Sequence, residues 1–135
     1  MEGEQNQIVR LQLENQKNTE KIMMEGISLQ GVQGNGKYMI CMGERGDTYA
    51  YDFYNEKTYG LGKADVLNGT ILAYLRGDKV WLVQENNKVT IYDLMNYTKS
   101  NIRLPEIEYT DFYMDCNGTL LGCSSKARKC MIVEA

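Results

Sequence analysis

The sequence predicts an all-β fold, because a repeat, evenly spaced acidic residues and a strand-like pattern of apolar residues occur together. Three glycines recur at intervals of 41 residues along the 135-residue chain: Gly36, Gly77 and Gly118. The same interval separates three acidic residues: Asp52, Asp93 and Glu134. Within each repeat, apolar residues alternate with polar ones or form short blocks bounded by Gly, Asn and Asp, which is typical of strands joined by turns. A period of about 40 residues built from strands indicates β-propeller blades.

Each of the first two repeats contains four expected strands. In the second repeat, where the pattern is clearest, they are residues 79–84, 88–94, 99–104 and 109–114. In the first repeat they are residues 37–42, 48–53, 58–61 and 70–75. We assign each set of four to one antiparallel blade. The prediction is a partial β-propeller of about three four-stranded blades, since closed rings have about four to eight.

We expect residues 1–135 to form a single domain, with repeats beginning near residues 36, 77 and 118. Residues 1–35 form a partial blade in this prediction. Within them, residues 8–17 align with residues 48–57 of the first repeat. A strand is expected over residues 8–13, because apolar and polar residues alternate from Val9 to Leu13 as in a half-buried strand. A helix is the alternative, but Asn15 and Asn18 interrupt its apolar seam.

Composition argues against several classes of partner. The chain has 15 Lys and Arg against 18 Asp and Glu, a net charge of −3, so it lacks the basic surface expected of a protein that binds nucleic acid or anionic membranes. No apolar run reaches the roughly 18 residues that span a bilayer, and residues 1–10 are polar and unlike a secretory signal. We therefore expect a cytoplasmic protein that binds neither nucleic acid nor membranes.

We predict that the cysteines are free thiols that fill core positions. There are four of them: Cys41, Cys116, Cys123 and Cys130. Cys41 and Cys123 occupy equivalent repeat positions, and Leu82 occupies the same position between them, which indicates an apolar slot. The chain has no histidine and no paired CxxC spacing, so we expect no zinc site.

Two segments resemble known repeat families. Residues 111–135, DFYMDCNGTLLGCSSKARKCMIVEA, resemble a WD-repeat blade, and residues 79–105, KVWLVQENNKVTIYDLMNYTKSNIRLP, are similar to a kelch blade. The Gly-His and Trp-Asp pairs of WD repeats and the Gly-Gly pair of kelch repeats are absent, so the subfamily stays open. The resemblance covers residues 28–135 and implies a ring that serves as a binding platform.

Two motifs come close to ligand-binding loops. GVQGNGKY at residues 31–38 differs from the phosphate-binding pattern GxxxxGK[ST] at Tyr38, and a strand rather than a helix is expected after it. Asp115-x-Asn117-Gly118 begins like a calcium loop but lacks the later acidic ligands. We interpret both as turns, and we interpret Asp52 and Asp93 as side chains that brace turns. The sequence therefore predicts no catalytic residue, cofactor or metal.

The favoured function is a non-catalytic scaffold for protein interaction. Tyrosine is enriched in interaction hot spots, and several of the ten tyrosines fall near turns. In an antiparallel meander, alternate turns share one face, and that face carries the expected partner-binding residues: Tyr54, Tyr59, Arg76, Asp78, Asn96 and Tyr97. We expect another chain to complete the ring, as a homodimer or a heteromer.

Two alternatives remain open at this point. One is a propeller enzyme, or a module for carbohydrates or small ligands, that uses carboxylates and aromatic residues at the mouth of the ring. The other is that the chain is an excerpt of a larger propeller protein.

Overall fold

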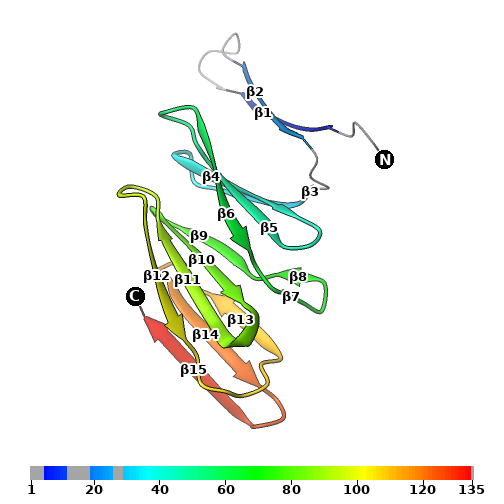
Figure 1. Cartoon of the computed structure of the whole chain (residues 1–135), viewed down its shortest axis with the longest axis vertical. Coiled ribbons are helices and arrows are strands. Elements are labelled where there is room, and N and C mark those ends of the chain that lie inside the picture. Colours follow the sequence, from blue (N-terminus) through cyan, green and yellow to red (C-terminus); the bar gives the residue numbers. More distant parts are fainter. Residues whose placement is uncertain (1–4, 12–18, 26–28, 135) are drawn as a thin grey trace.

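The computed structural model describes residues 5–11, 19–25 and 29–134 (Figure 1). The first element is an antiparallel pair formed by β1 (Gln5–Leu11) and β2 (Thr19–Glu25). The strand predicted from Ile8 is thus confirmed as far as Leu11, and its last two residues lie outside the described residues. No helix in the described part of the chain is long and apolar enough to cross a membrane.

The first four-stranded sheet is an antiparallel meander in chain order. Its strands are β3 (Leu29–Gly34), β4 (Tyr38–Gly43), β5 (Asp47–Asp52) and β6 (Lys57–Lys63). A small hairpin of β7 (Val66–Leu67) and β8 (Thr70–Ile71) follows it. This hairpin joins the first sheet to the second (Figure 1).

The second sheet is also a four-stranded meander, and the third has three strands. The second contains β9 (Ala73–Arg76), β10 (Lys79–Gln84), β11 (Lys88–Asp93) and β12 (Thr98–Arg103), with the short 3-10 turn η1 (Glu85–Asn87) between β10 and β11. The third contains β13 (Asp111–Met114), β14 (Thr119–Ser124) and β15 (Lys129–Glu134).

The all-β class and the partial propeller are confirmed, but the predicted grouping of strands into blades is wrong by one strand. The strand predicted at 109–114 as the last of the second blade is β13, the first strand of the third sheet. Likewise, β9 begins the second sheet rather than ending the first. Only Gly77 and Asp78 separate β9 from β10, a tight hairpin connection, whereas residues 104–110 form a longer connection between β12 and β13.

Side chains between neighbouring sheets form the core. Between the first and second sheets, Ile40 and Met42 pack against Val80 and Leu82, and all four are at most 5% exposed. Between the second and third sheets, Trp81 is 1% exposed and packs in one cluster with residues of β13 and β14. The strands are covered on both faces, which explains why β4 and β10 read as continuous apolar runs.

The three repeat glycines occupy equivalent turns before the second strand of each sheet. Gly36, Gly77 and Gly118 all have positive φ, at 86°, 59° and 84°, where a side chain is disfavoured. The repeat does not hold beyond the third turn, because β4 and β10 begin two residues after their glycine and β14 begins one residue after. A shift of one residue turns every side chain of a strand to the opposite face.

Candidate protein-interaction surfaces

The turns that carry the predicted partner-binding residues lie on one side of the molecule. The β5–β6 and β11–β12 turns extend beyond the same ends of their sheets as the β3–β4 and β9–β10 turns do (Figure 1). A carboxylate braces the β5–β6 turn, and another braces the β11–β12 turn. Asp52 Oδ1 accepts hydrogen bonds from the amides of Tyr54 and Asn55, at 2.9 and 3.1 Å. Asp93 Oδ1 accepts from the amides of Met95 and Asn96, at 3.0 and 3.2 Å.

These hydrogen bonds favour the charged form of each carboxylate. Burial acts to raise the pKa of Asp52, but the bonds from Asn55 and Tyr54 outweigh it and hold the pKa below its ordinary value. The amide of Asn96 lowers the pKa of Asp93 in the same way. The interpretation of Asp52 and Asp93 as braces of turns is confirmed. Asn96, predicted to bind a partner, also donates its side-chain amide to Asp93 Oδ2 at 3.2 Å.

Three exposed side chains lie on these turns, Tyr54, Met95 and Tyr97, and the partly buried Tyr59 of β6 contacts Tyr97. We call these four residues the aromatic turn patch. Tyr54 is 90% exposed, Tyr97 57% and Met95 55%. The rings of Tyr59 and Tyr97 lie 5.1 Å apart, so the patch joins β6 of the first sheet to the β11–β12 turn of the second. A hydrogen bond with Tyr97 raises the pKa of Tyr59 to about 12. The structure therefore brings together two of the predicted residues.

Arg76 and Asp78, also predicted to bind a partner, hold neighbouring sheets together. Arg76 donates from Nε to the carbonyl oxygen of Asp115 at 2.8 Å and from Nη2 to that of Met114 at 3.0 Å, which ties β9 to the third sheet. Asp78 pairs with Lys37 Nζ at 3.1 Å, and this hydrogen bond raises the pKa of Lys37. Both side chains therefore make contacts between sheets of this chain.

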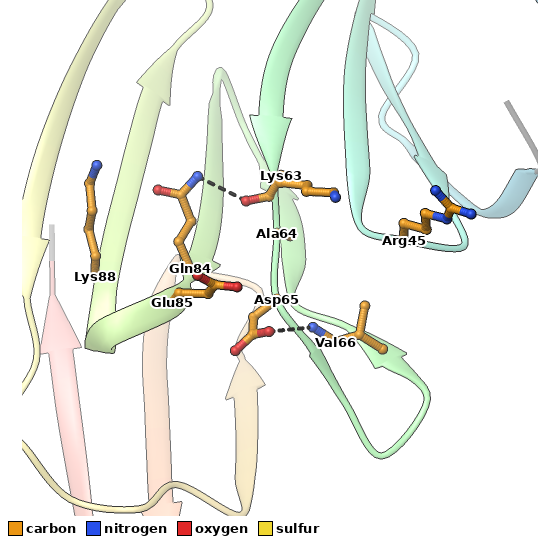
Figure 2. Close-up of a pocket in the computed structure, with 8 residues that line it drawn as sticks. All are labelled: Arg45, Lys63, Ala64, Asp65, Val66, Gln84, Glu85 and Lys88. Carbon is orange, nitrogen blue, oxygen red and sulfur yellow. Dashed lines mark hydrogen bonds between the residues drawn. The ribbon is translucent and has the colours of Figure 1, made fainter. Parts of the chain in front are cut away.

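The opposite ends of the sheets border a cavity of about 440 Å³ between the first and second sheets. Figure 2 shows its lining: Arg45, Lys63, Ala64, Asp65, Val66, Gln84, Glu85 and Lys88. Gln84 spans the gap by donating from Nε2 to the carbonyl oxygen of Lys63 at 2.9 Å. The cavity holds both signs of charge and no aromatic side chain. Sequence reasoning missed it, since the residues come from three separate connections with no shared motif.

The third sheet presents an apolar face that no described residue of another sheet covers. A row of directly opposed residues crosses it, Tyr113 on β13, Leu121 on β14 and Ile132 on β15. Tyr113 is 63% exposed and Ile132 65%. Cys123 and Cys130 form the adjacent row, with the charged residue Asp111 opposite Cys123 on β13. We call the five uncharged residues of these two rows the open blade face.

The second sheet shows how a face with this pattern of residues packs against a neighbouring sheet. Tyr74, Trp81 and Ile91 form the matching row across β9, β10 and β11, and Val83 opposes Val89 in the adjacent row. Four of these five side chains are at most 6% exposed, because the third sheet packs on them, and Tyr74 is partly buried there. The third sheet has apolar residues at the same positions, so its face has the composition of a blade-to-blade contact.

The prediction of four free thiols is wrong. Cys123 and Cys130 face each other across β14 and β15 with their Cα atoms 4.1 Å apart and form a disulfide. The shift by one residue in the third repeat is the reason, because it places Cys123 on the open blade face rather than in the slot of Cys41 and Leu82. Cys41 is buried and free, and burial raises its pKa to about 11. Cys116 is exposed and free.

Both motifs that come close to ligand loops form turns. Asn35 Oδ1 accepts the amides of Lys37 and Tyr38 at 3.1 and 2.9 Å, and Gly36 follows Asn35 with positive φ. Asp115 Oδ1 accepts the amides of Asn117 and Thr119, each at 2.9 Å. In the part of the chain that the structure describes, no three Cys, Asp or Glu side chains lie close enough to hold a metal ion.

The stacked antiparallel meanders define a protein of the β-propeller class. The crystal structure of HIRA(644-1017) is similar to this chain, with a TM-score of 0.53 at 8% identity over 85% of this chain. The chain spans 42% of the length of that structure. No protein family model and no curated protein matches the sequence.

Two further crystal structures resemble the chain more weakly. The N-terminal domain of Nup159 has a TM-score of 0.47 at 10% identity, over 84% of this chain and 32% of its own length. The tricorn protease has a TM-score of 0.46 at 15% identity, over 84% of this chain and 14% of its own length. The fold assignment depends on the strand topology and on the likeness to HIRA.

Proposed function

We propose that this protein is a non-catalytic interaction module of the β-propeller type, which binds a protein partner through the aromatic turn patch. The observation that carries the proposal is the exposure of Tyr54, Met95 and Tyr97, at 90%, 55% and 57%, on the turns of two neighbouring sheets. Tyrosine and methionine are enriched at the centres of protein interfaces, where they supply large contact areas. The contact between Tyr59 and Tyr97 fixes the two parts of the patch relative to each other.

The other three residues expected to bind a partner position the aromatic turn patch. Arg76 and Asp78 fix the sheets that carry the turns, through their contacts with the third and first sheets. Asn96 helps Asp93 to fix the β11–β12 turn. In this proposal they position the patch, and the tyrosines make the contact with the partner.

The proposal includes completion of the ring by another chain. The open blade face carries apolar side chains at the positions through which the second sheet packs on the third. A second copy of this chain, a different protein, or further sequence of a longer polypeptide would cover this face. Residues 1–135 act as a single cytoplasmic domain in this proposal.

The test of the aromatic turn patch is affinity capture from a cell extract followed by quantitative mass spectrometry. The double variant Tyr54→Ser, Tyr97→Ser is compared with the unchanged chain and with Tyr113→Ser, which removes from the open blade face a tyrosine about as exposed as Tyr97. We expect at least one protein to be retained by the unchanged chain and by Tyr113→Ser and to be lost from the double variant. Identical sets from all three chains would contradict the proposal.

The alternative of a small-ligand module rests on the cavity of Figure 2, where Asp65 and Glu85 lie with three cationic side chains. Carbohydrate sites combine carboxylates with aromatic faces, and this cavity lacks aromatic side chains. A smaller cavity of about 210 Å³ has both, but its Tyr109 and Phe112 pack in the core cluster between the second and third sheets. The interaction module therefore has the stronger support.

A further inference from the structure

A further cavity, of about 460 Å³, lies between the second and third sheets where the β9–β10 and β13–β14 turns meet. These turns and the strands beside them supply its lining: Arg76, Gly77, Lys79, Trp81, Cys116, Asn117, Gly118 and Thr119. Two of these described side chains are cationic and none is acidic, whereas the cavity of Figure 2 holds both signs of charge. We call the cavity between the second and third sheets the basic cavity.

The two cations of the basic cavity lie directly opposite each other on neighbouring strands. Arg76 ends β9 and Lys79 begins β10, and the two residues are paired across the hairpin. Like charges at directly opposed positions destabilise a sheet. Neither cation forms an ion pair with another described residue. Asp93 lies opposite Lys79 on β11, but its carboxylate binds the β11–β12 turn and does not line the cavity.

Arg76 is half-buried, and its guanidinium group binds only neutral groups. It donates hydrogen bonds to the main-chain oxygens of Leu75, Met114 and Asp115. A guanidinium group has five N–H groups, so two remain after these three bonds. The carbonyl groups fix the position of the cation but leave its net charge in place, and burial makes such a charge costly. An anion in the basic cavity would accept the remaining N–H groups and neutralise this charge.

The equivalent place between the first and second sheets is neutralised by a carboxylate of the chain itself. There Lys37, the residue after the first repeat glycine, pairs at 3.1 Å with Asp78, the residue after the second repeat glycine. The residue after the third repeat glycine is Thr119, which is uncharged and lines the basic cavity. The third sheet therefore presents a hydroxyl group at the turn position where the second sheet presents the neutralising carboxylate.

We infer that the basic cavity is an anion-binding site whose ligand is a phosphate monoester of a small molecule. A phosphate monoester carries a charge of about −1.5 to −2 at neutral pH, which matches two cations, whereas a carboxylate would leave one cation unneutralised. Its oxygens accept hydrogen bonds, and Arg76, Lys79 and Thr119 supply donors. The volume of the cavity also leaves room for the organic part of a small ligand. The inference goes beyond the proposed interaction function and uses no residue of the aromatic turn patch.

Cys116 provides a chemical reporter in the lining of the basic cavity. Its thiol is free and exposed, whereas Cys41 is buried and Cys123 and Cys130 are joined in a disulfide. The uncharged reagent N-ethylmaleimide should therefore label Cys116 on the folded chain. An anion bound beside this thiol obstructs the reagent and disfavours the reactive thiolate, so occupancy of the cavity slows labelling.

The test follows the rate of labelling of Cys116 by mass spectrometry as phenyl phosphate is added at constant ionic strength. We expect saturable slowing by phenyl phosphate and much weaker slowing by benzoate, a monoanion of similar shape. Lys79→Met should raise the concentration of phenyl phosphate that gives half protection by about tenfold, because it removes a charged hydrogen-bond donor. Lys99→Met removes an exposed lysine of β12 outside the cavity and should leave this concentration unchanged.

Three results would overturn the inference, each obtained with chains whose circular dichroism shows the β fold. The first is labelling of Cys116 that phenyl phosphate does not slow in a saturable way. The second is equal protection by phenyl phosphate of the unchanged chain and Lys79→Met, or by phenyl phosphate and benzoate of the unchanged chain. The third is half protection by a phosphoserine peptide at a concentration more than tenfold below that of phenyl phosphate, since the phosphate group then belongs to a protein partner.

Discussion

Substituting one glycine tests whether the first sheet and the segment after it are as close as the structure places them. Gly46 lies in the β4–β5 turn with φ of 90°, and a Cβ atom there would overlap the main-chain oxygen of Ala64 and lie 3.0 Å from its carbonyl carbon. The amide of Ala64 also donates to the carbonyl oxygen of Gly46 at 2.8 Å. Gly46→Ala must therefore displace backbone that is held by a hydrogen bond.

Gly36 provides the matched control. Its φ is 86°, close to that of Gly46, but nothing lies within 4 Å of its Cβ position. Gly36→Ala should cost about 1–2 kcal/mol, the strain of a left-handed backbone with a side chain. Gly46→Ala adds the lost hydrogen bond and the shift of Ala64, which is 4% exposed, so we expect a total of about 3 kcal/mol or more.

Urea unfolding followed by far-ultraviolet circular dichroism measures both losses, and the linear dependence on urea gives each free energy of unfolding. The informative quantity is the difference between the free energies lost by the two variants, because the strain of a side chain at positive φ is common to both and cancels. Equal losses for Gly46→Ala and Gly36→Ala would refute the close approach of Ala64 to the β4–β5 turn.

Three further predictions concern charges and thiols. Arg76→Met should lower the free energy of unfolding by about 2 kcal/mol, because it removes charged hydrogen bonds to the third sheet, whereas the exposed neighbour Lys79→Met should change it by less than about 0.5 kcal/mol. Asp52→Ala should destabilise the chain at neutral pH. The pKa of Asp52 is lowered in the folded state, so its contribution is present above about pH 4 and disappears as the pH falls further; urea midpoints of variant and unchanged chain should converge at low pH. Thiol titration of unfolded, unreduced protein should find two reactive groups, and four would contradict the disulfide.

The strands were predictable from the sequence because their signal is local. The expected strand at 79–84 coincides with β10, since a run of apolar residues bounded by Gly77 and the Asn-rich turn can be read without knowledge of its neighbours. The grouping of strands into sheets depends instead on which connections are short enough to be hairpins. The two-residue connection at Gly77 and Asp78 indicates that the strands on either side of it belong to one sheet. Because the repeats were counted from glycine to glycine, the prediction placed these two strands in different blades.

The candidate surfaces were predictable only in part, for a related reason. The exposed aromatic residues at Tyr54 and Tyr97 followed from their places in turns. The open blade face did not, because it depends on the faces of β14, and the repeat counted from Gly118 is one residue out of register with that strand. Arg76 was expected on the surface, yet the carbonyl groups that it binds lie about 40 residues away, beyond any local pattern.

Trp81 gives the chain a built-in optical reporter of one contact between sheets. It is the only tryptophan in the sequence, it is 1% exposed, and it belongs to the cluster between the second and third sheets. In a stack of repeats that touch only their neighbours, individual contacts can separate before the whole structure unfolds. A shift of the emission of Trp81 to longer wavelength therefore reports undocking of the third sheet, whether or not the contact between the first and second sheets has opened.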